Sequence, residues 1–378
     1  MKKIVMLTAV LGLFLCGGFG VSAATVEELY TEQLQASGGE ELIGALPHET
    51  QALLRDLGID TLDPDAFSEM DTETVWDSLT ELMVAAFRTP LTTAGTVLAI
   101  VLLHAWINGL RHTLREEETS AVFGTVCALA ACGSVILPLT ACITAVREAM
   151  TATGVFMTSF TPVYAGVLFS SGRAAAALSF QSVTLAAAQM MTWLSGQVVV
   201  PLMTVSLALG VTGSVTPQIN LSSAGKLFGK AAVWLLTLGM MLFSGLLSLQ
   251  NLTARAADNL GTRAIKFSIS SFVPVVGSSL SEAFSTIRGC LHLLHSTLGA
   301  FSVAATALIV LPPLLQCIGW NILLSVCHMA ADMFELRALG DVLDAARRTV
   351  RCLIGALAAA GSFLIIAVTV VSTAATGG

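Results

Sequence analysis

From Thr89 to its end the chain is almost continuously apolar, and only short charged stretches interrupt it. Of all residues, 55% are hydrophobic and 11% are charged, and the mean hydropathy is +0.82. A soluble domain carries about 25% charged residues. About 20 consecutive apolar residues cross a bilayer as a helix, and a helix satisfies its own backbone hydrogen bonds there. The sequence therefore predicts an all-α, polytopic helical membrane protein.

The apolar region, residues 88–378, divides into segments of roughly the length of a membrane span. These are residues 90–110, 120–143, 155–170, 174–196, 198–215, 231–249, 291–311, 314–333 and 352–373. Two of the segments are short and contain a proline, Pro162 or Pro201. Such segments are typical of broken or re-entrant helices beside a transport pathway, and also of ordinary kinked helices. We therefore expect six to nine spans, some of them broken.

One stretch, residues 262–288, is too polar for an ordinary span and too apolar for a loop in water. Pro274 removes a backbone donor and Gly277 loosens the following turn, so a helix is interrupted there. Interrupted backbone at membrane depth needs protein or a wet cavity beside it. We therefore expect this stretch to line the inside of the membrane domain. The candidate pathway or docking residues are Lys266, Phe272, Pro274 and Gly277 here, and Pro162, Gly172 and Pro201 elsewhere.

The N-terminal part has a different composition. Lys2 and Lys3 precede an apolar run that ends near small residues at positions 21–23, which predicts a signal peptide over residues 1–23. An uncleaved first span is the alternative. Residues 24–87 hold fifteen Asp or Glu and one base, Arg55. Pro47 and Gly58 are placed to begin and end a helix. We expect a small acidic helical segment with a solvated surface.

The distribution of basic residues predicts orientation. Arg111 and Arg115 follow the first span of the apolar region, which places that loop on the cytoplasmic side and residues 24–87 on the extracytoplasmic side. After Lys230 the bases fall on several loops, so the side of the C-terminus stays open. No basic stripe interleaved with aromatic residues occurs, so the sequence gives no support for nucleic-acid binding.

Ionisable side chains within apolar segments are the candidates for chemistry. His104 lies in the middle of a span, where it could relay protons or bond to a neighbouring helix. His292 and His295 share one helical face, and with His328 they could form a three-nitrogen metal site, but no carboxylate is placed beside them. No zinc-protease, serine-hydrolase or ATP-binding motif is present. We expect no enzymatic activity, no metal and no cofactor.

Small residues recur every fourth position in two spans, at Gly124, Ala128 and Cys132 and again around Ala356 and Ala360. Such faces let helices approach closely, within one chain or between copies, so a homo-oligomer is one interpretation. The seven cysteines outside the leader lie in or beside apolar segments and form no CxxC pair. They are expected to be small packing residues rather than a disulfide framework.

Several motifs together resemble the stage III sporulation protein AE family of endospore-forming bacteria. They are TRAIKF at 262–267, SFVPVVG at 271–277, QVVVPL at 197–202, Phe156-Met157 with Pro162, the Ser170-Ser171-Gly172 turn and Leu339-Gly340-Asp341 before the last span. The plan of a leader, a small exported segment and a long polytopic region is also similar. The resemblance covers most of the chain and is weakest over residues 24–87.

This resemblance implies a non-enzymatic integral membrane component of the sporulation channel, or feeding-tube, complex between mother cell and forespore, required after engulfment. Its partners would be the other stage III sporulation A-operon membrane proteins and, indirectly, stage II sporulation protein Q. Its location would be the mother-cell membrane around the forespore. The residues alone also allow a stand-alone secondary transporter or permease with a midplane site at the proline-broken helices.

Overall fold

The computed structural model describes residues 26–63, 72–114, 118–215, 221–272 and 277–376, and every regular element in these ranges is helical. The predicted signal peptide lies outside them. In chain order the helices are α2 (Val26–Ser37), the 3-10 helix η1 (Gly39–Leu42), α3 (His48–Asp56), α5 (Thr72–Leu114), α6 (Glu118–Ser170), α7 (Ala174–Leu194), the π-helix η2 (Ser195–Val199), α8 (Val200–Val215), α9 (Leu221–Phe272), α10 (Gly277–Met333) and α11 (Arg337–Thr376).

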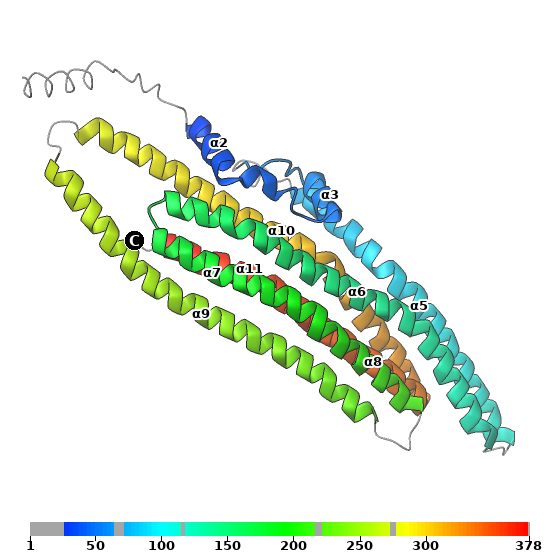
Figure 1. Cartoon of the computed structure of the whole chain (residues 1–378). Helices are drawn as coiled ribbons and strands as arrows, with labels where there is room; N and C mark the ends of the chain where they lie inside the picture. The colour runs from blue at the N-terminus through cyan, green and yellow to red at the C-terminus, as the bar shows by residue number, and fades with distance from the viewer. Residues whose placement is uncertain (1–25, 64–71, 115–117, 216–220, 273–276, 377–378) are drawn as a thin grey trace, which may run out of the picture.

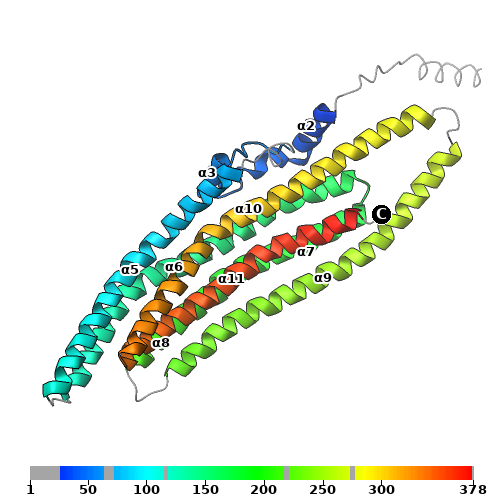
Figure 2. The same ribbon diagram turned by 180° about the vertical axis from the view of Figure 1, so that it is seen from behind.

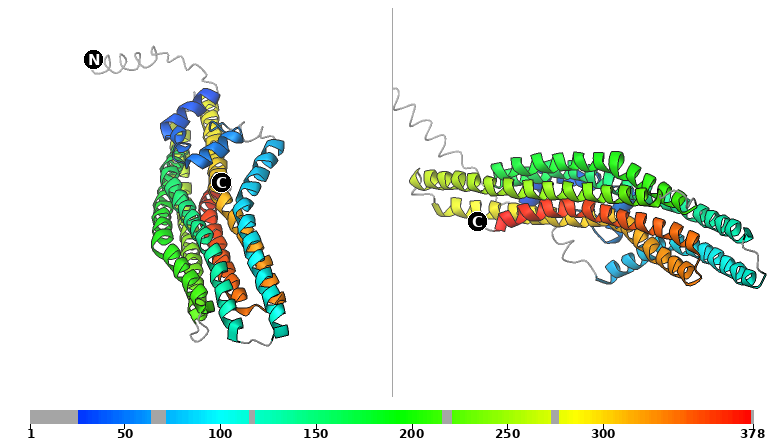
Figure 3. Two further views of the ribbon diagram at one scale, coloured as in Figure 1. Left: turned by 90° about the vertical axis from the view of Figure 1, so that its right-hand side faces the viewer. Right: turned by 90° about the horizontal axis from the view of Figure 1, so that it is seen from below.

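The long helices run side by side in an elongated, curved bundle (Figures 1 and 2). The α5–α6 hairpin projects at one end, and the α6–α7 turn and the C-terminus lie toward the other (Figure 1). Viewed from below, the helices curve together along their whole length (Figure 3, right). Helices α6, α9 and α10 have 53, 52 and 57 residues. At 1.5 Å per residue each is about 80 Å long, so each extends beyond a hydrocarbon core of about 30 Å.

In the described part of the chain, six helical stretches are long and apolar enough to cross a membrane. They are Glu73–Ile107, Val126–Ser170, Ala174–Gly213, Ser223–Asp258, Gly289–Met333 and Arg337–Thr369. The separate segments expected from the sequence merge in pairs. Residues 120–143 and 155–170 both belong to α6, residues 291–311 and 314–333 both belong to α10, and residues 174–196 and 198–215 are joined through the π-helix.

The two prolines behave differently. Pro162 lies inside α6, which continues to Ser170, so of the two alternatives the unbroken helix applies there. Pro201 follows the π-helix Ser195–Val199 directly. A proline in a helix leaves the carbonyl four residues earlier without a partner and crowds it, and here that carbonyl belongs to Gln197, inside the wider π turn. The helix is therefore irregular beside Pro201, but it is not broken there.

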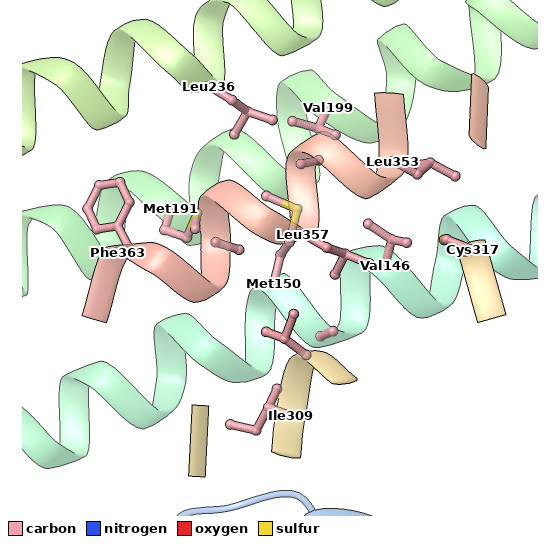
Figure 4. Packing of buried hydrophobic residues seen from close by; sticks show 14 of the residues in the cluster. Val146, Met150, Met191, Val199, Leu236, Ile309, Cys317, Leu353, Leu357 and Phe363 are labelled. Atoms are coloured by element: carbon pink, nitrogen blue, oxygen red, sulfur yellow. The ribbon is translucent and has the colours of Figure 1, made fainter. Parts of the chain in front are cut away.

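Helix α11 is the centre of the bundle and packs against α6, α7, α8, α9 and α10. Around Leu357, side chains from these helices point toward one another, including Met150 of α6 and Met191 of α7 (Figure 4). The small side chains of Ala356 and Ala360 are fully buried. The Ala356–Ala360 face of α11 therefore serves packing within the chain, and it is not exposed to a second copy.

Glycines bring α8, α9 and α11 into close contact. A Cβ added to Gly225 would lie 2.9 Å from the carbonyl oxygen of Ser206, and one added to Gly210 would lie 2.7 Å from the Cβ of Ala345. The Ser206 hydroxyl donates a hydrogen bond of 2.7 Å to the Gly225 carbonyl. Small residues and hydroxyls of this kind hold membrane helices together. This interface was not among those expected from the sequence.

The N-terminal segment, α2 to Asp63, packs beside the bundle against α6 and α10 (Figure 1). Pro47 precedes α3 and Gly58, with φ +76°, follows its end, so the predicted helix start and stop are confirmed. Leu54 is fully buried. The buried Tyr30 hydroxyl donates a hydrogen bond of 2.6 Å to the carbonyl of Leu62, which closes the segment on itself. Its helical nature is as expected.

Candidate functional site

The most distinctive polar contact inside the bundle joins α6 to α10. The Tyr164 hydroxyl lies 2.6 Å from His295 Nε2. Tyr164 is 0% exposed and His295 is 7% exposed. Which of the two groups donates depends on the tautomer of the imidazole. Ionisable groups buried among apolar helices are costly unless they are paired, so this contact is a candidate functional element.

Two phenylalanines pack against Tyr164, and two more extend the aromatic cluster. Tyr164 lies 5.2 Å from Phe160 and 5.1 Å from Phe180, measured between ring centroids, and 4.8 Å from the imidazole of His295. Phe156 extends the row to Phe160 at 5.8 Å and contacts Phe301 of α10 at 6.1 Å. Offset and edge contacts of this kind add stability beyond burial alone. The rings come from α6, α7 and α10, so the cluster fastens three helices together.

The α6–α7 turn contains Gly172, one of the residues singled out from the sequence. Gly172 has φ +77°, a left-handed conformation that favours glycine. Just beyond it, the carboxylate of Asp258 on α9 accepts hydrogen bonds from the backbone N–H groups of Ala175, at 2.9 Å, and Ala176, at 3.0 Å. A carboxylate at a helix N-terminus satisfies free donors and favours the helix dipole. Asp258 therefore anchors the start of α7 to α9.

Nothing in the sequence alone marks Asp258 as a capping residue. Asp258 is one acid in the charged end of an otherwise apolar segment. It is 83 residues away from Ala175, whose N–H group it binds. Tyr164 lies in an apolar run, and no motif marks it out. His295 was a candidate, but for a metal site. The contacts of all three residues depend on which helices pack together.

The candidate pathway residues that the structure describes are distributed over α6, the α6–α7 turn, α8, α9 and α10. Pro162 and Pro201 are exposed on α6 and α8, and Gly172 is exposed at the α6–α7 turn. Lys266 lies near the end of α9, Phe272 is its last residue, and Gly277 begins α10. Pro274 lies outside the described residues. A pathway role for these residues remains a prediction.

Two of the three histidines that could form a metal site, His295 and His328, have different partners. His295 pairs with Tyr164, whereas His328 Nε2 lies 3.3 Å from the carboxylate of Asp332 on the same helix. Among the described residues, no three His, Cys, Asp or Glu side chains are grouped in a way that could hold a metal ion. His104 is buried within α5.

A second polar cluster lies on α11, where Asp344 forms ion pairs with Arg347, at 3.0 Å, and with Arg348. These groups lie three and four residues apart on one helix face, which is the spacing that supports such pairs. The cluster belongs to the charged first half of α11, ahead of the apolar second half.

The family model of stage III sporulation protein AE matches residues 65–375, which includes every long helix of the bundle. The chain belongs to the stage III sporulation protein AE family. It is 25% identical to stage III sporulation protein AE of Bacillus subtilis (strain 168) over 286 residues, covering 74% of this chain and 70% of the relative. No solved structure matches the chain. The family resemblance predicted from the sequence motifs is confirmed, and this member of the stage III sporulation protein AE family is a multi-pass membrane protein involved in sporulation.

Proposed function

We propose that the protein is a non-enzymatic integral membrane component of the channel, or feeding-tube, complex between mother cell and forespore, and that it acts after engulfment. The observation that carries this proposal is the match of the family model over residues 65–375. Within the described residues, two of the polar contacts join helices of the bundle to one another. Tyr164 bonds to His295, and Asp258 bonds to the start of α7. Contacts of this kind stabilise the packing of the helices, as expected for a structural component.

The proposed partners are the other stage III sporulation A-operon membrane proteins and, indirectly, stage II sporulation protein Q. The N-terminal segment is the surface we assign to such contacts, because it lies along one side of the bundle (Figure 1) and because several of its acids are exposed. Glu32, Glu40, Glu41 and Glu49 are all exposed. With this segment outside the cytoplasm of the mother cell, its negative charge would favour a basic surface on a partner.

Deletion of the gene tests the proposal. Spore development should stop after engulfment, and the full-length gene should restore it. A version in which Glu32, Glu40, Glu41 and Glu49 are all replaced by Gln should restore development poorly while accumulating in the membrane normally. Normal sporulation of the deletion strain would refute the proposal. Full restoration by the four-Gln version would refute only the assignment of the partner surface.

A secondary transporter remains the second candidate, and the π-helix before Pro201 favours it because such irregular turns are frequent at functional sites. The two candidates differ in what the isolated protein does. Purified protein in sealed vesicles should move no small solute by itself if it is a component of a complex. Solute uptake by the isolated protein, lost on replacement of Pro201 by Leu, would support the transporter instead.

A further inference from the structure

A groove of about 530 Å³ lies between the N-terminal segment and the middle of α6. Residues 45–47, which precede α3, form one wall, and Arg147, Glu148, Thr151, Ala152 and Val155 of α6 form the other. The lining therefore combines two charged side chains with apolar ones. Its volume falls within the range of ordinary small-molecule sites.

Arg147 and Glu148 are unusual for their position in α6. No charged residue occurs between positions 120 and 146 or between positions 149 and 170. Each of these stretches is long enough to cross the hydrocarbon core as a helix. Whichever of the two stretches crosses the membrane, Arg147 and Glu148 lie at its edge, at the depth of the lipid head groups.

Neither charged side chain has a hydrogen-bond or ion-pair partner among the described residues. The backbone carbonyl of Arg147 accepts a hydrogen bond of 3.4 Å from the Ser195 hydroxyl, but its guanidinium and the Glu148 carboxylate are exposed at the groove. A guanidinium binds a phosphate through two parallel hydrogen bonds. A carboxylate accepts hydrogen bonds from a primary ammonium.

We propose that this groove binds the head group of a zwitterionic phospholipid that carries a primary ammonium, as in phosphatidylethanolamine. Arg147 contacts the phosphate and Glu148 contacts the ammonium. The glycerol and the upper acyl chains lie against Leu46, Ala152 and Val155. Val155 is 50% exposed, so the groove offers apolar surface that a lipid would cover. The lipid therefore lies between the N-terminal segment and α6.

The charges of the groove select among lipids and against free phosphate. Glu148 repels an anionic head group, and Arg147 is the one base among the described residues that line the groove. A choline head group carries a positive charge but has no N–H to donate to a carboxylate. A free phosphate would leave the apolar wall uncovered. The expected order of affinity is ethanolamine first, choline second, and glycerol head groups and inorganic phosphate last.

The experiment uses the purified full-length chain, stripped of bound lipid in detergent and titrated with short-chain lipids that carry each head group. The wild type should bind the ethanolamine lipid most tightly. Arg147→Gln should weaken this binding by about tenfold or more, because it removes a charge-assisted contact. Glu148→Gln should abolish the preference for ethanolamine over choline. The matched control is Arg88→Gln, which removes an exposed arginine of α5 that does not line the groove, and it should leave binding unchanged.

A second variant keeps the test decisive if a charge change disturbs folding. Val155→Trp places a large ring in the groove without altering a charge, and it should reduce binding of the ethanolamine and choline lipids alike. Equal binding of all lipids by the wild type, or unchanged binding by folded Arg147→Gln and Val155→Trp variants, would overturn the proposal. Competition by millimolar inorganic phosphate would show a simple anion site and would overturn it as well. These outcomes concern the isolated protein and do not depend on the proposed function.

Discussion

Tyr164→Phe is the sharpest test of the bundle interior, because it removes one hydroxyl and leaves the ring contacts in place. The ring of residue 164 keeps its neighbours Phe160 and Phe180 at 5.2 and 5.1 Å. What is lost is the 2.6 Å contact with His295 Nε2. Since His295 is only 7% exposed, water cannot easily replace the lost partner.

The size of the effect follows from this burial. An unsatisfied buried polar group costs about 1–3 kcal/mol. Interhelical hydrogen bonds in membrane proteins contribute about 0.6 kcal/mol on average, and up to about 1.7. We therefore expect Tyr164→Phe to lower the free energy of unfolding by about 1–2 kcal/mol. His295→Leu should cost a similar amount, because it leaves the Tyr164 hydroxyl buried without a partner.

The double variant tests whether Tyr164 and His295 stabilise the protein through their contact with each other or independently. Replacing both partners by apolar groups removes the unsatisfied atoms, so Tyr164→Phe/His295→Leu should cost at least about 0.6 kcal/mol less than the sum of the single variants. Reversible unfolding in mixed micelles, followed by circular dichroism, measures all four proteins. Thr237→Val is the control, since its exposed hydroxyl bonds only to a carbonyl of its own helix. Strictly additive single losses would refute the pairing.

Three further predictions concern other contacts. Asp258→Asn should weaken the cap of α7 by about 1 kcal/mol. The measurement is amide hydrogen exchange in the first turn of α7, which should become faster. Unchanged exchange would contradict the capping role of Asp258. A lipid-permeable oxidant should cross-link Cys142 to Cys317, because their sulfurs lie 3.2 Å apart. Cys142→Ser should abolish this disulfide. A disulfide that persists in the variant would show that other thiols had reacted. Burial raises the pKa of the Tyr30 phenol above its ordinary value of about 10. The neutral form therefore stabilises the folded segment below that pH, and this stability is lost as the pH rises through the raised value. Protease accessibility of the N-terminal segment should increase there in the wild type and not in Tyr30→Phe, and identical profiles would argue against the phenol as the cause.

The sequence could predict those features of the fold that depend on the backbone of a few neighbouring residues. Pro47 and Gly58 act on their own backbone, so the bounds of α3 could be predicted. Pro201 acts on the turn before it, so an irregular helix could be expected there. Pro162 carried the same signal, yet α6 continues through it. The outcome at a proline depends on whether neighbouring helices and side chains accommodate the carbonyl that it leaves unbonded.

The candidate site depended on contacts between distant parts of the chain. Tyr164 and His295 are 131 residues apart, and Asp258 lies 83 residues from the N–H group that it caps. The spacing of His292 and His295 suggested a metal site, because spacing in the sequence shows only which residues are neighbours on the same helix. The partner of His295 is on a different helix, and no periodicity within α10 could identify it.

By itself the sequence determined that the chain crosses a membrane as helices, because unpaired backbone groups in lipid are too costly for other structures. Only the tertiary structure decided which apolar segments join into one helix, and that α11 lies at the centre of the bundle. Lipid tails are as apolar as leucine, so a hydrophobic pattern does not tell which faces of these helices meet. Small residues and a few buried polar groups make that choice, and their partners become visible only once the helices are packed.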